Sequence, residues 1–281
     1  MEHFGGAGHS SEILKRLSTK GILIGIDRDL EALEVAKKKL EKYPNVIYVH
    51  NNHDQIRNIL EELKIEKVDG ILLDLGVSSY QIDEKSRGFS YIEDSPLDMR
   101  MDKTQKKTAK EVVNTYKEEE LARILYEYGE EKKSRQIARH ICEIRKKHPL
   151  ETTQELVEVV RNVITNKKEL HPEKRTFQAI RIEVNNEIEP LYQTVIDCIH
   201  CLKPKGRLCI ITFHSLEDRA VKNAFRDSVG KCTCPKDLPY CICNHPKLGN
   251  IITPKPIQPS KEELQENSRS ASSKLRIFEK T

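Results

Sequence analysis

Two aspartates each follow a short apolar run, at a point where a buried strand would end. Asp27 follows the run at residues 22–26, and Asp74 follows the run at residues 68–73. A glycine-rich stretch at residues 5–10 precedes both. In an open α/β sheet, such a turn lets a ligand approach the backbone, and an acid at the next strand end accepts hydrogen bonds from ribose hydroxyls. The pattern therefore predicts a nucleoside site with Asp27 as the ribose acceptor, and a tight turn without a ligand is the alternative.

The glycine spacing bears on which nucleoside would bind. A dinucleotide fingerprint has a third glycine that allows close packing of helix and strand, but this chain reads Gly6-x-Gly8-x-x-Ser11. S-adenosylmethionine has no pyrophosphate and does not need that packing, so it is the predicted ligand. An NAD-dependent oxidoreductase is the alternative enzyme. Asp74 would face either the methionine end or the reacting group, or else would be a turn acid without a ligand.

These residues lie in a repeating pattern of apolar runs and amphipathic stretches. Such a pattern predicts an α/β fold with a parallel sheet covered on both faces. The predicted strands are residues 22–26, 46–49, 68–73 and 207–213, and the helices among the first three are residues 12–17, 30–40 and 56–63. Asp29 is expected to cap the second of these helices.

The middle of the chain carries only helical patterns. After an aperiodic stretch at residues 76–107, apolar residues recur at helical spacing through residues 121–164, and one long helix is predicted over residues 184–199. The strand at 207–213 then returns the chain to the sheet. The predicted domains are a sheet domain in two halves, residues 1–100 and 172–281, and a helical insertion, residues 101–171, that recognises the substrate.

The composition limits the class of protein. The 281 residues include 48 Lys+Arg and 44 Asp+Glu, and a net charge of +4 gives no strong global field, so nucleic-acid binding must use local patches. No apolar run approaches the roughly 18 to 20 residues of a membrane-spanning helix. Residues 1–4 have neither the basic start nor the apolar core of a secretory signal. We therefore expect a cytoplasmic protein with reduced thiols and no membrane partner.

Seven stretches are long and unusual enough to indicate a family. They are Ala-Gly-His-Ser (7–10), Gly-Ile-Asp-Arg-Asp (25–29), Leu-Leu-Asp-Leu-Gly-Val-Ser-Ser-x-Gln-Ile-Asp (72–83), Arg-Gly-Phe-Ser (87–90), Pro-Leu-Asp-Met-Arg-Met-Asp (96–102), Phe-Gln-Ala-Ile-Arg (177–181) and Phe-His-Ser-Leu-Glu-Asp-Arg (213–219). Together they resemble the bacterial 16S ribosomal RNA cytosine-N4 methyltransferase family. The resemblance implies a class I methyltransferase fold with a Rossmann-like sheet and a helical insertion. It also implies S-adenosylmethionine as methyl donor and a decoding-centre cytidine as acceptor.

The resemblance assigns donor-binding positions one by one. They fall on Ala7, Gly8, His9, Asp27, His53, Asp74 and Gln81. His53 departs from the aromatic residue more usual there, and its imidazole would still stack on adenine over a smaller apolar area. An exposed loop histidine is the alternative for this position.

The resemblance also implies features that this chain lacks. A strand should precede the glycine turn, but only residues 1–4 precede Gly5. We therefore expect the family's N-terminal segment and first strand to be missing, which leaves the activity of this chain open. The tail at residues 267–276 departs from the family pattern, and a weaker tail contact to RNA is expected.

Methylation of a cytosine amine needs an acceptor for the amine proton and a methyl donor held in line. Asp74 and Asp98 are the candidate catalytic carboxylates, and a structural ion pair between Asp98 and Arg100 is the alternative for the second. Arg100 and His214 are the candidate substrate-binding residues. Ser215, as a cap of the next helix, gives the segment around His214 an alternative structural purpose.

Two further groups of residues could bind ligands. Cations gather in the helical insertion, where residues 132, 135 and 139 are predicted to share a helical face and to contact RNA phosphates or only solvent; they are Lys132, Lys133, Arg135, Arg139, Arg145, Lys146 and Lys147. Cysteines at 232, 234, 241 and 243 invite a zinc interpretation, but one intervening residue is unfavourable for tetrahedral thiolate geometry. We therefore predict reduced loop thiols and no metal. Cys142, Cys198, Cys201 and Cys209 are expected in the core.

The function predicted from the sequence is S-adenosylmethionine-dependent methylation of a cytidine N4 amine in 16S ribosomal RNA. The expected partner is that RNA or the small ribosomal subunit, and the choice between monomer and homodimer is open. The main alternative outside enzymes is a non-catalytic RNA-binding or ribosome-assembly protein.

Overall fold

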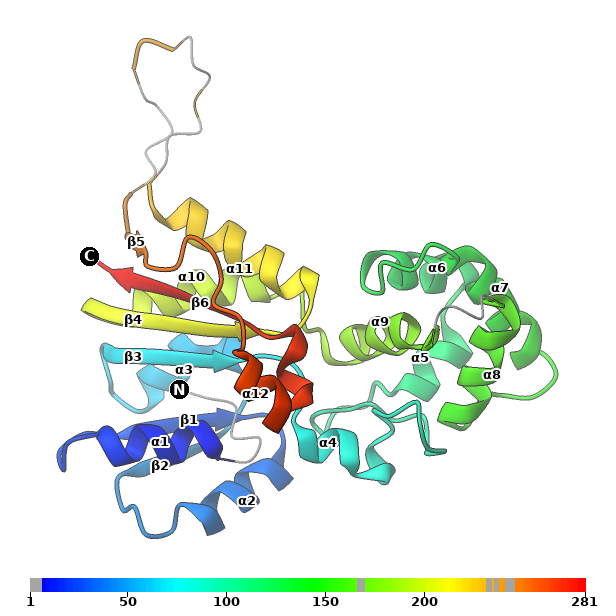
Figure 1. Cartoon of the computed structure of the whole chain (residues 1–281), viewed down its shortest axis with the longest axis horizontal. Helices are drawn as coiled ribbons and strands as arrows, with labels where there is room; N and C mark the ends of the chain where they lie inside the picture. The colour runs from blue at the N-terminus through cyan, green and yellow to red at the C-terminus, as the bar shows by residue number, and fades with distance from the viewer. Residues whose placement is uncertain (1–6, 166–169, 231–233, 235–237, 241–245) are drawn as a thin grey trace. The chain divides into compact units, whose positions relative to one another are not determined.

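The computed structural model describes residues 7–165, 170–230, 234, 238–240 and 246–281. The chain forms two compact units (Figure 1): unit 1 comprises Met1–Gly76 with Ile188–Thr281, and unit 2 comprises Val77–Glu187. Unit 2 is longer than the predicted insertion at residues 101–171. The reason is packing: Phe89, Leu97 and Phe177 lie outside the predicted range but belong to the apolar core of the helices.

Unit 1 contains the strands. Parallel strands β1 (Leu23–Asp27) and β2 (Val46–His50) form one sheet. The second sheet has the order β3-β4-β6-β5, formed by β3 (Val68–Asp74), β4 (Leu202–Thr212), β6 (Lys274–Lys280) and β5 (Gly249–Ile251). β3 and β4 are parallel, whereas β6 runs antiparallel to both of its neighbours. The α/β class is confirmed, but the expectation of a parallel sheet is wrong for the second sheet, because β6 runs opposite to the other strands.

Unit 1 also contains several helices, most of which pack on these strands through apolar cores. They are α1 (Gly8–Arg16), α2 (Leu30–Lys39), α3 (Ile56–Glu62), α10 (Leu191–Cys201), α11 (Ser215–Ser228) and α12 (Lys261–Glu266), with short 3-10 turns η1 (His53–Gln55) and η3 (Ser268–Ser272). Figure 1 shows α2 beside β1 and β2, and α11 beside β4 and β6. The core joins Ile26 of β1, Leu73 of β3, Val195 of α10 and Phe225 of α11.

Strand β1 has one edge that no described strand covers. All five of its residues are buried, and β2 pairs with one side of it. Ile26 and the β3 residue Leu73 belong to the same core, yet β1 and β3 are not hydrogen-bonded neighbours. The strand expected ahead of the glycine turn is not among the strands of the described range, and residues 1–6 lie outside it.

The regular secondary structure of unit 2, over residues 77–165 and 170–187, is helical. Its helices are α4 (Ser79–Asp83), α5 (Ala109–Thr115), α6 (Glu118–Glu127), α7 (Ser134–Arg145), α8 (Thr153–Val163) and α9 (Lys174–Asn185), with a 3-10 turn η2 (Lys85–Arg87). Leu121, Ile124 and Leu125 of α6 face Ile137 and Ile141 of α7 across a buried core. In the part of the chain that the structure describes, every helix is too short or too polar to cross a membrane.

The long helix predicted over residues 184–199 is wrong. Helix α9 ends at Asn185, and Asn186 adopts a left-handed backbone conformation with φ of 49°. Helix α10 begins only after Pro190, which occupies its N-cap. Asparagine tolerates the left-handed region, and proline lacks the N–H that an interior helical position donates. The helical spacing of apolar residues therefore continues across residues 186–190, although the helix itself is interrupted there.

Candidate functional site

The first turn of α1 lies against the end of β3. His9 Nε2 is 3.7 Å from Asp74 Oδ2, and the two side chains are 53% and 27% exposed. β1 and β3 run in the same direction in Figure 1, so Asp27 and Asp74 both lie at the carboxyl end of their strands. In α/β sheets this edge is where ligands bind. Three of the predicted positions, His9, Asp27 and Asp74, are thus at one edge of unit 1.

The N-terminus of α1 is suited to a negatively charged group. Ala7 occupies the N-cap with φ of 56° and ψ of 22°, a left-handed conformation, and gives the helix no side-chain cap. A Cβ added at Gly8 would meet no heavy atom within 4 Å, so the approach to the first turn is open. Helix N-termini carry partial positive charge on their N–H groups. The helix begins at Gly8 and not at the predicted residue 12, and Gly5 and Gly6 lie outside the described residues.

Asp27 and Asp29 divide two tasks at the end of β1. The Asp29 N–H donates to Asp27 Oδ1 at 2.8 Å, and the Asp29 side chain in turn accepts from the Glu31 N–H at 3.0 Å. Asp29 therefore caps α2, as predicted. Asp27 is only 3% exposed, and its carboxylate is an acceptor held in a fixed place at the strand end.

His53 lies in the turn after β2, at the same edge as Asp27. The Asn51 N–H donates to the Asp27 carbonyl at 3.1 Å, which ties this turn to the end of β1. His53 begins η1, and solvent reaches neither of its ring nitrogens. The alternative of an exposed loop histidine is therefore wrong, and a stacking role for its ring remains a prediction.

Gln81 belongs to unit 2 and has a structural task there. Its side-chain oxygen accepts from the Ser78 N–H at 3.0 Å, and its own N–H donates to Ser78 Oγ at 3.2 Å. This reciprocal pair is a capping box at the start of α4, and Gln81 is buried. Donor binding by Gln81 remains a prediction.

Asp98 and Arg100, also in unit 2, form a bidentate ion pair. Arg100 Nε donates to Asp98 Oδ1 at 2.9 Å and Nη2 donates to Oδ2 at 2.8 Å. Burial alone would raise the pKa of Asp98, but the hydrogen bonds and charge of Arg100 outweigh it, and the pKa lies below its ordinary value. A carboxylate held in this way is a weak proton acceptor. The ion-pair alternative is confirmed, and direct roles for either residue remain predictions.

The loop that carries this pair is fixed by two buried residues to which the sequence interpretation gave no role. Arg87 Nη2 donates to the carbonyls of Arg100 and Met101 at 3.0 and 2.9 Å. Asn185 accepts from the Met101 N–H and donates to the Met99 carbonyl, both at 2.8 Å. Met99 has a φ of 59°, a left-handed conformation that these bonds stabilise. Only the unusual Arg-Gly-Phe-Ser string hinted at a task for Arg87.

His214 is a helix cap in unit 1. Its Nε2 lies 3.1 Å from Glu217 Oε1, and the two side chains are 9% and 2% exposed. Glu217 Oε2 accepts from the N–H groups of Phe213 and His214 at 2.7 and 3.3 Å. The predicted cap, Ser215, is instead the first residue of α11. The ring of His214 is buried beside Glu217. A substrate contact by His214 remains a prediction.

The cysteines divide into a core set and a loop set. Cys142, Cys198 and Cys201 are buried, which confirms their assignment to the core, and Cys209 lies partly buried in β4. Burial raises the pKa of Cys198 and Cys201, so these thiols are poor nucleophiles. Of the four loop cysteines in the zinc interpretation, Cys234 is described, and Cys232, Cys241 and Cys243 lie outside the described residues.

Comparisons with known proteins bear on the whole chain. The sequence profile of the MraW methylase family matches residues 2–281. A ribosomal RNA small subunit methyltransferase H from Clostridium botulinum (strain Kyoto / Type A2) is 59% identical over 278 residues, which are 98% of this chain and 90% of that protein. A protein of the same name from Finegoldia magna is 53% identical over 281 residues, with the same coverage.

A solved structure is also similar. It is a Streptococcus mutans protein in complex with SAH, with a TM-score of 0.39, 12% sequence identity, and coverage of 100% of this chain and 86% of that chain. The profile and the two relatives confirm the family resemblance and the enzyme class predicted from the sequence. Because the profile match runs over residues 2–281 and the relatives are more than half identical along nearly the whole chain, the chain belongs to the MraW methylase family.

Proposed function

We propose that this chain transfers the methyl group of S-adenosylmethionine to the N4 amine of a cytidine in 16S ribosomal RNA. Family membership supports methyl transfer, and the names of the relatives support RNA of the small subunit as the substrate. The assignment of the cytidine N4 atom as methyl acceptor rests on the family resemblance of the seven sequence stretches. The structural observation that carries the proposal is the approach of His9 to Asp74, at the edge of unit 1 where β1 ends in Asp27.

The residues at this edge fit the chemical groups of the donor. A ribose presents two hydroxyl donors, and the buried Asp27 carboxylate is an acceptor. An amino acid presents a carboxylate and an ammonium group. The uncapped N-terminus of α1 suits the carboxylate. When bound, S-adenosylmethionine supplies an electrophilic methyl group on its sulfonium sulfur.

The lone pair of the cytosine amine is delocalised into the ring, so the amine is a poor nucleophile. A proton must leave the nitrogen as it bonds to the methyl carbon, because the nitrogen would otherwise carry a positive charge. Of the two candidate carboxylates, Asp74 is the better acceptor in our proposal. Its side chain is partly exposed and lies near His9, whereas both oxygens of Asp98 are held by Arg100. We assign to Asp98 a positioning role: its ion pair shapes the loop at residues 96–102.

The experiment that tests the proposal follows the methyl group. The purified chain is mixed with S-adenosylmethionine labelled at the methyl group and with small subunits from a strain that lacks this modification. The RNA is then digested and its nucleosides are analysed by mass spectrometry. Labelled N4-methylcytidine is the expected product, and Asp74→Asn should lower its rate of formation by at least tenfold.

Other outcomes would replace the proposal. Label on another nucleoside would retain a methyltransferase but reject N4 of cytidine. Binding of RNA and of the donor without transfer would favour a non-catalytic assembly protein. Stronger retention of NAD than of S-adenosylmethionine would favour an oxidoreductase.

A further inference from the structure

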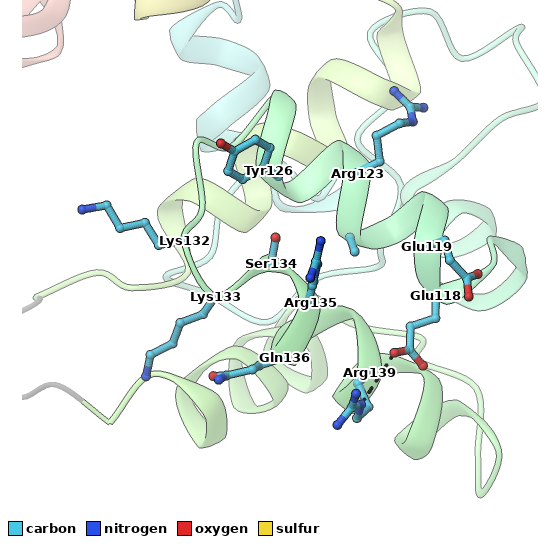
Figure 2. A pocket seen from close by; sticks show the side chains of 11 residues that line it. Glu118, Glu119, Arg123, Tyr126, Lys132, Lys133, Ser134, Arg135, Gln136 and Arg139 are labelled. Carbon is cyan, nitrogen blue, oxygen red and sulfur yellow. Dashed lines mark ion pairs between the residues drawn. The ribbon is translucent and has the colours of Figure 1, made fainter.

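A groove in unit 2 lies between α6 and α7, and none of the predicted donor-binding or catalytic residues lines it. Its volume is about 940 Å³. Figure 2 shows Glu118 and Glu119 at one end of the groove and Lys132 and Lys133 at the other. The lining residues are Glu118, Glu119, Ala122, Arg123, Tyr126, Lys132, Lys133, Ser134, Arg135, Gln136 and Arg139.

Positive charge dominates this lining. It has five lysine or arginine side chains and two glutamates. Arg123 pairs with Glu127, and Arg139 lies 3.6 Å from Glu118, so part of the charge is neutralised locally. Lys132 and Arg135 are exposed and have no acidic partner among the residues that the structure describes. These two cations are therefore available to an anionic ligand.

The start of α7 adds to the positive end. Lys133 occupies the N-cap and gives no side-chain hydrogen bond to the helix, and Ser134, Arg135 and Gln136 of the first turn line the groove. The prediction that residues 132, 135 and 139 share a helical face is wrong for Lys132, because the helix begins at Ser134. The three side chains nevertheless line one groove. The buried Glu131 offsets the partial positive charge of the helix N-terminus, because its Oε1 accepts from the Lys133 N–H at 2.8 Å, so the side chains supply the positive charge of the groove.

An exposed aromatic ring lies among these cations. Tyr126 on α6 has a large, mainly apolar side chain, yet the residue is 65% exposed. Figure 2 shows it on the opposite wall of the groove from Arg135. Its ring makes little contribution to the core, whereas Leu121, Ile124 and Leu125 of the same helix are fully buried. A flat exposed ring beside cations suits a stacked base.

We propose that this groove binds a single-stranded segment of RNA. Lys132 and Arg135 contact its phosphates, and Tyr126 stacks on one unpaired base. The inference deepens the proposed function, on which the identity of the ligand as RNA rests. A single strand is favoured over a duplex because paired bases present no free face to Tyr126. The aromatic ring also favours RNA over an acidic peptide, which would use the charges alone.

The test measures binding of a fluorescent single-stranded RNA oligonucleotide by anisotropy at several salt concentrations. The double variant Lys132→Glu/Arg135→Glu should weaken binding by at least tenfold and reduce the salt dependence by about 0.7 per lost phosphate contact. Tyr126→Ala should weaken binding roughly fivefold or more, and Tyr126→Phe should restore it. Thermal unfolding checks that each variant is folded.

A matched control exists on the same helix. Lys146 and Lys147 are exposed just beyond the other end of α7, about 18 Å from Arg135 at 1.5 Å per residue. Lys146→Glu/Lys147→Glu makes the same change of charge and should change affinity less than threefold. An equal loss in this control would reject the groove as the site and leave only a general effect of charge.

Three further results would overturn the inference: equal binding of a duplex of the same length, no effect of Tyr126→Ala, or competition by polyglutamate as strong as by polyuridylate. Methyl transfer is measured in parallel so that the two proposals can fail separately. If the unmodified chain methylates small subunits but the groove variants keep the same KM for them, the proposed function stands and the groove inference is rejected. If RNA binding depends on the groove but no methyl transfer occurs, the groove inference stands and the proposed function is rejected.

Discussion

Arg100 holds the carboxylate of Asp98 at both oxygens, and its backbone N–H also donates to Asp98 Oδ1 at 3.0 Å. Both side chains are about one-fifth exposed. Burial would raise the pKa of Asp98, but the hydrogen bonds and charge of Arg100, together with the charge of Arg87, lower it below its ordinary value. At neutral pH this carboxylate is therefore ionised and fixed in place, and the pair joins two positions on either side of the left-handed Met99.

The first prediction concerns the pH dependence of this pair. A carboxyl group with a lowered pKa in the folded state stabilises the protein above its unfolded pKa, and the stabilisation is lost as the pH falls through the folded pKa. Asp98→Asn should therefore lower the free energy of unfolding by about 1–3 kcal/mol between pH 5 and 8. Below the ordinary value of 3.8 the difference from the unmodified chain should shrink.

Urea unfolding of both proteins at a series of pH values checks this. Asp102→Asn is the control, since the Asp102 carboxylate in the same loop accepts hydrogen bonds from the backbone N–H and hydroxyl of Thr104. A difference between Asp98→Asn and the unmodified chain that persists unchanged at pH 3 would contradict the assigned cause.

The second prediction separates ligand binding from helix capping at the end of β1. Asp27→Asn should weaken S-adenosylmethionine binding by roughly 10- to 100-fold, because a charged acceptor for the ribose hydroxyls becomes neutral. Asp29→Asn should leave binding within about twofold, since asparagine is an equally good N-cap for α2. Isothermal titration calorimetry measures both. Equal losses in the two variants would show that the strand end acts only as a structural unit.

The third prediction concerns the pair that ties β6 to α11. Arg276 is 6% exposed and donates to both oxygens of Asp218, at 2.6 and 3.1 Å. Arg276→Met should lower the free energy of unfolding by about 3–5 kcal/mol, because it leaves a shielded carboxylate without its main partner. Lys203→Met removes the exposed pair with Asp69 and should cost less than about 1 kcal/mol. Chemical denaturation compares the two, and a similar loss in each would reject the role of burial.

The fourth prediction concerns the uncovered edge of β1. The Leu23 N–H donates to the Asn45 carbonyl, and the Asn51 N–H donates to the Asp27 carbonyl. Because N–H groups alternate in direction along a strand, those of Ile24 and Ile26 point away from β2. We expect these two amides to exchange with deuterium at least tenfold faster than the Gly25 amide, although their side chains are buried. Equal protection, measured by NMR, would mean that another segment pairs with this edge.

The sequence predicted the strands that follow simple apolar runs. The first three begin and end within one residue of the runs at 22–26, 46–49 and 68–73. The match is expected for β1, whose continuous apolar residues are buried on both faces. Strands β5 and β6 were not predicted. In β6, the buried Arg276 and Phe278 alternate with partly exposed residues, and a buried arginine hides the apolar period that would mark a strand.

The site was predictable in part for the same reason. The positions of Asp27 and Asp74 at one edge of unit 1 could be predicted because each ends an apolar run, and their separation in sequence does not matter when strand ends share an edge. Arg87 and Asn185 gave no such signal. They support the loop at residues 96–102 by donating to its carbonyls or accepting from its amides across 13 to 86 positions of sequence. Only the folded chain reveals which residues bond to a loop backbone.

The order of strands in unit 1 determines which parts of the chain can fold first during synthesis. β3 pairs with β4, and the whole of unit 2 separates them in the chain. β6 lies between β4 and β5 although it is made after both. On the translating ribosome, unit 2 is fully polymerised once residue 187 has been added, whereas the larger sheet waits for residues 274–280. The helical unit therefore has time to fold while its host is still a partial sheet, and the edge that β6 later covers is exposed to chaperones until the last strand emerges.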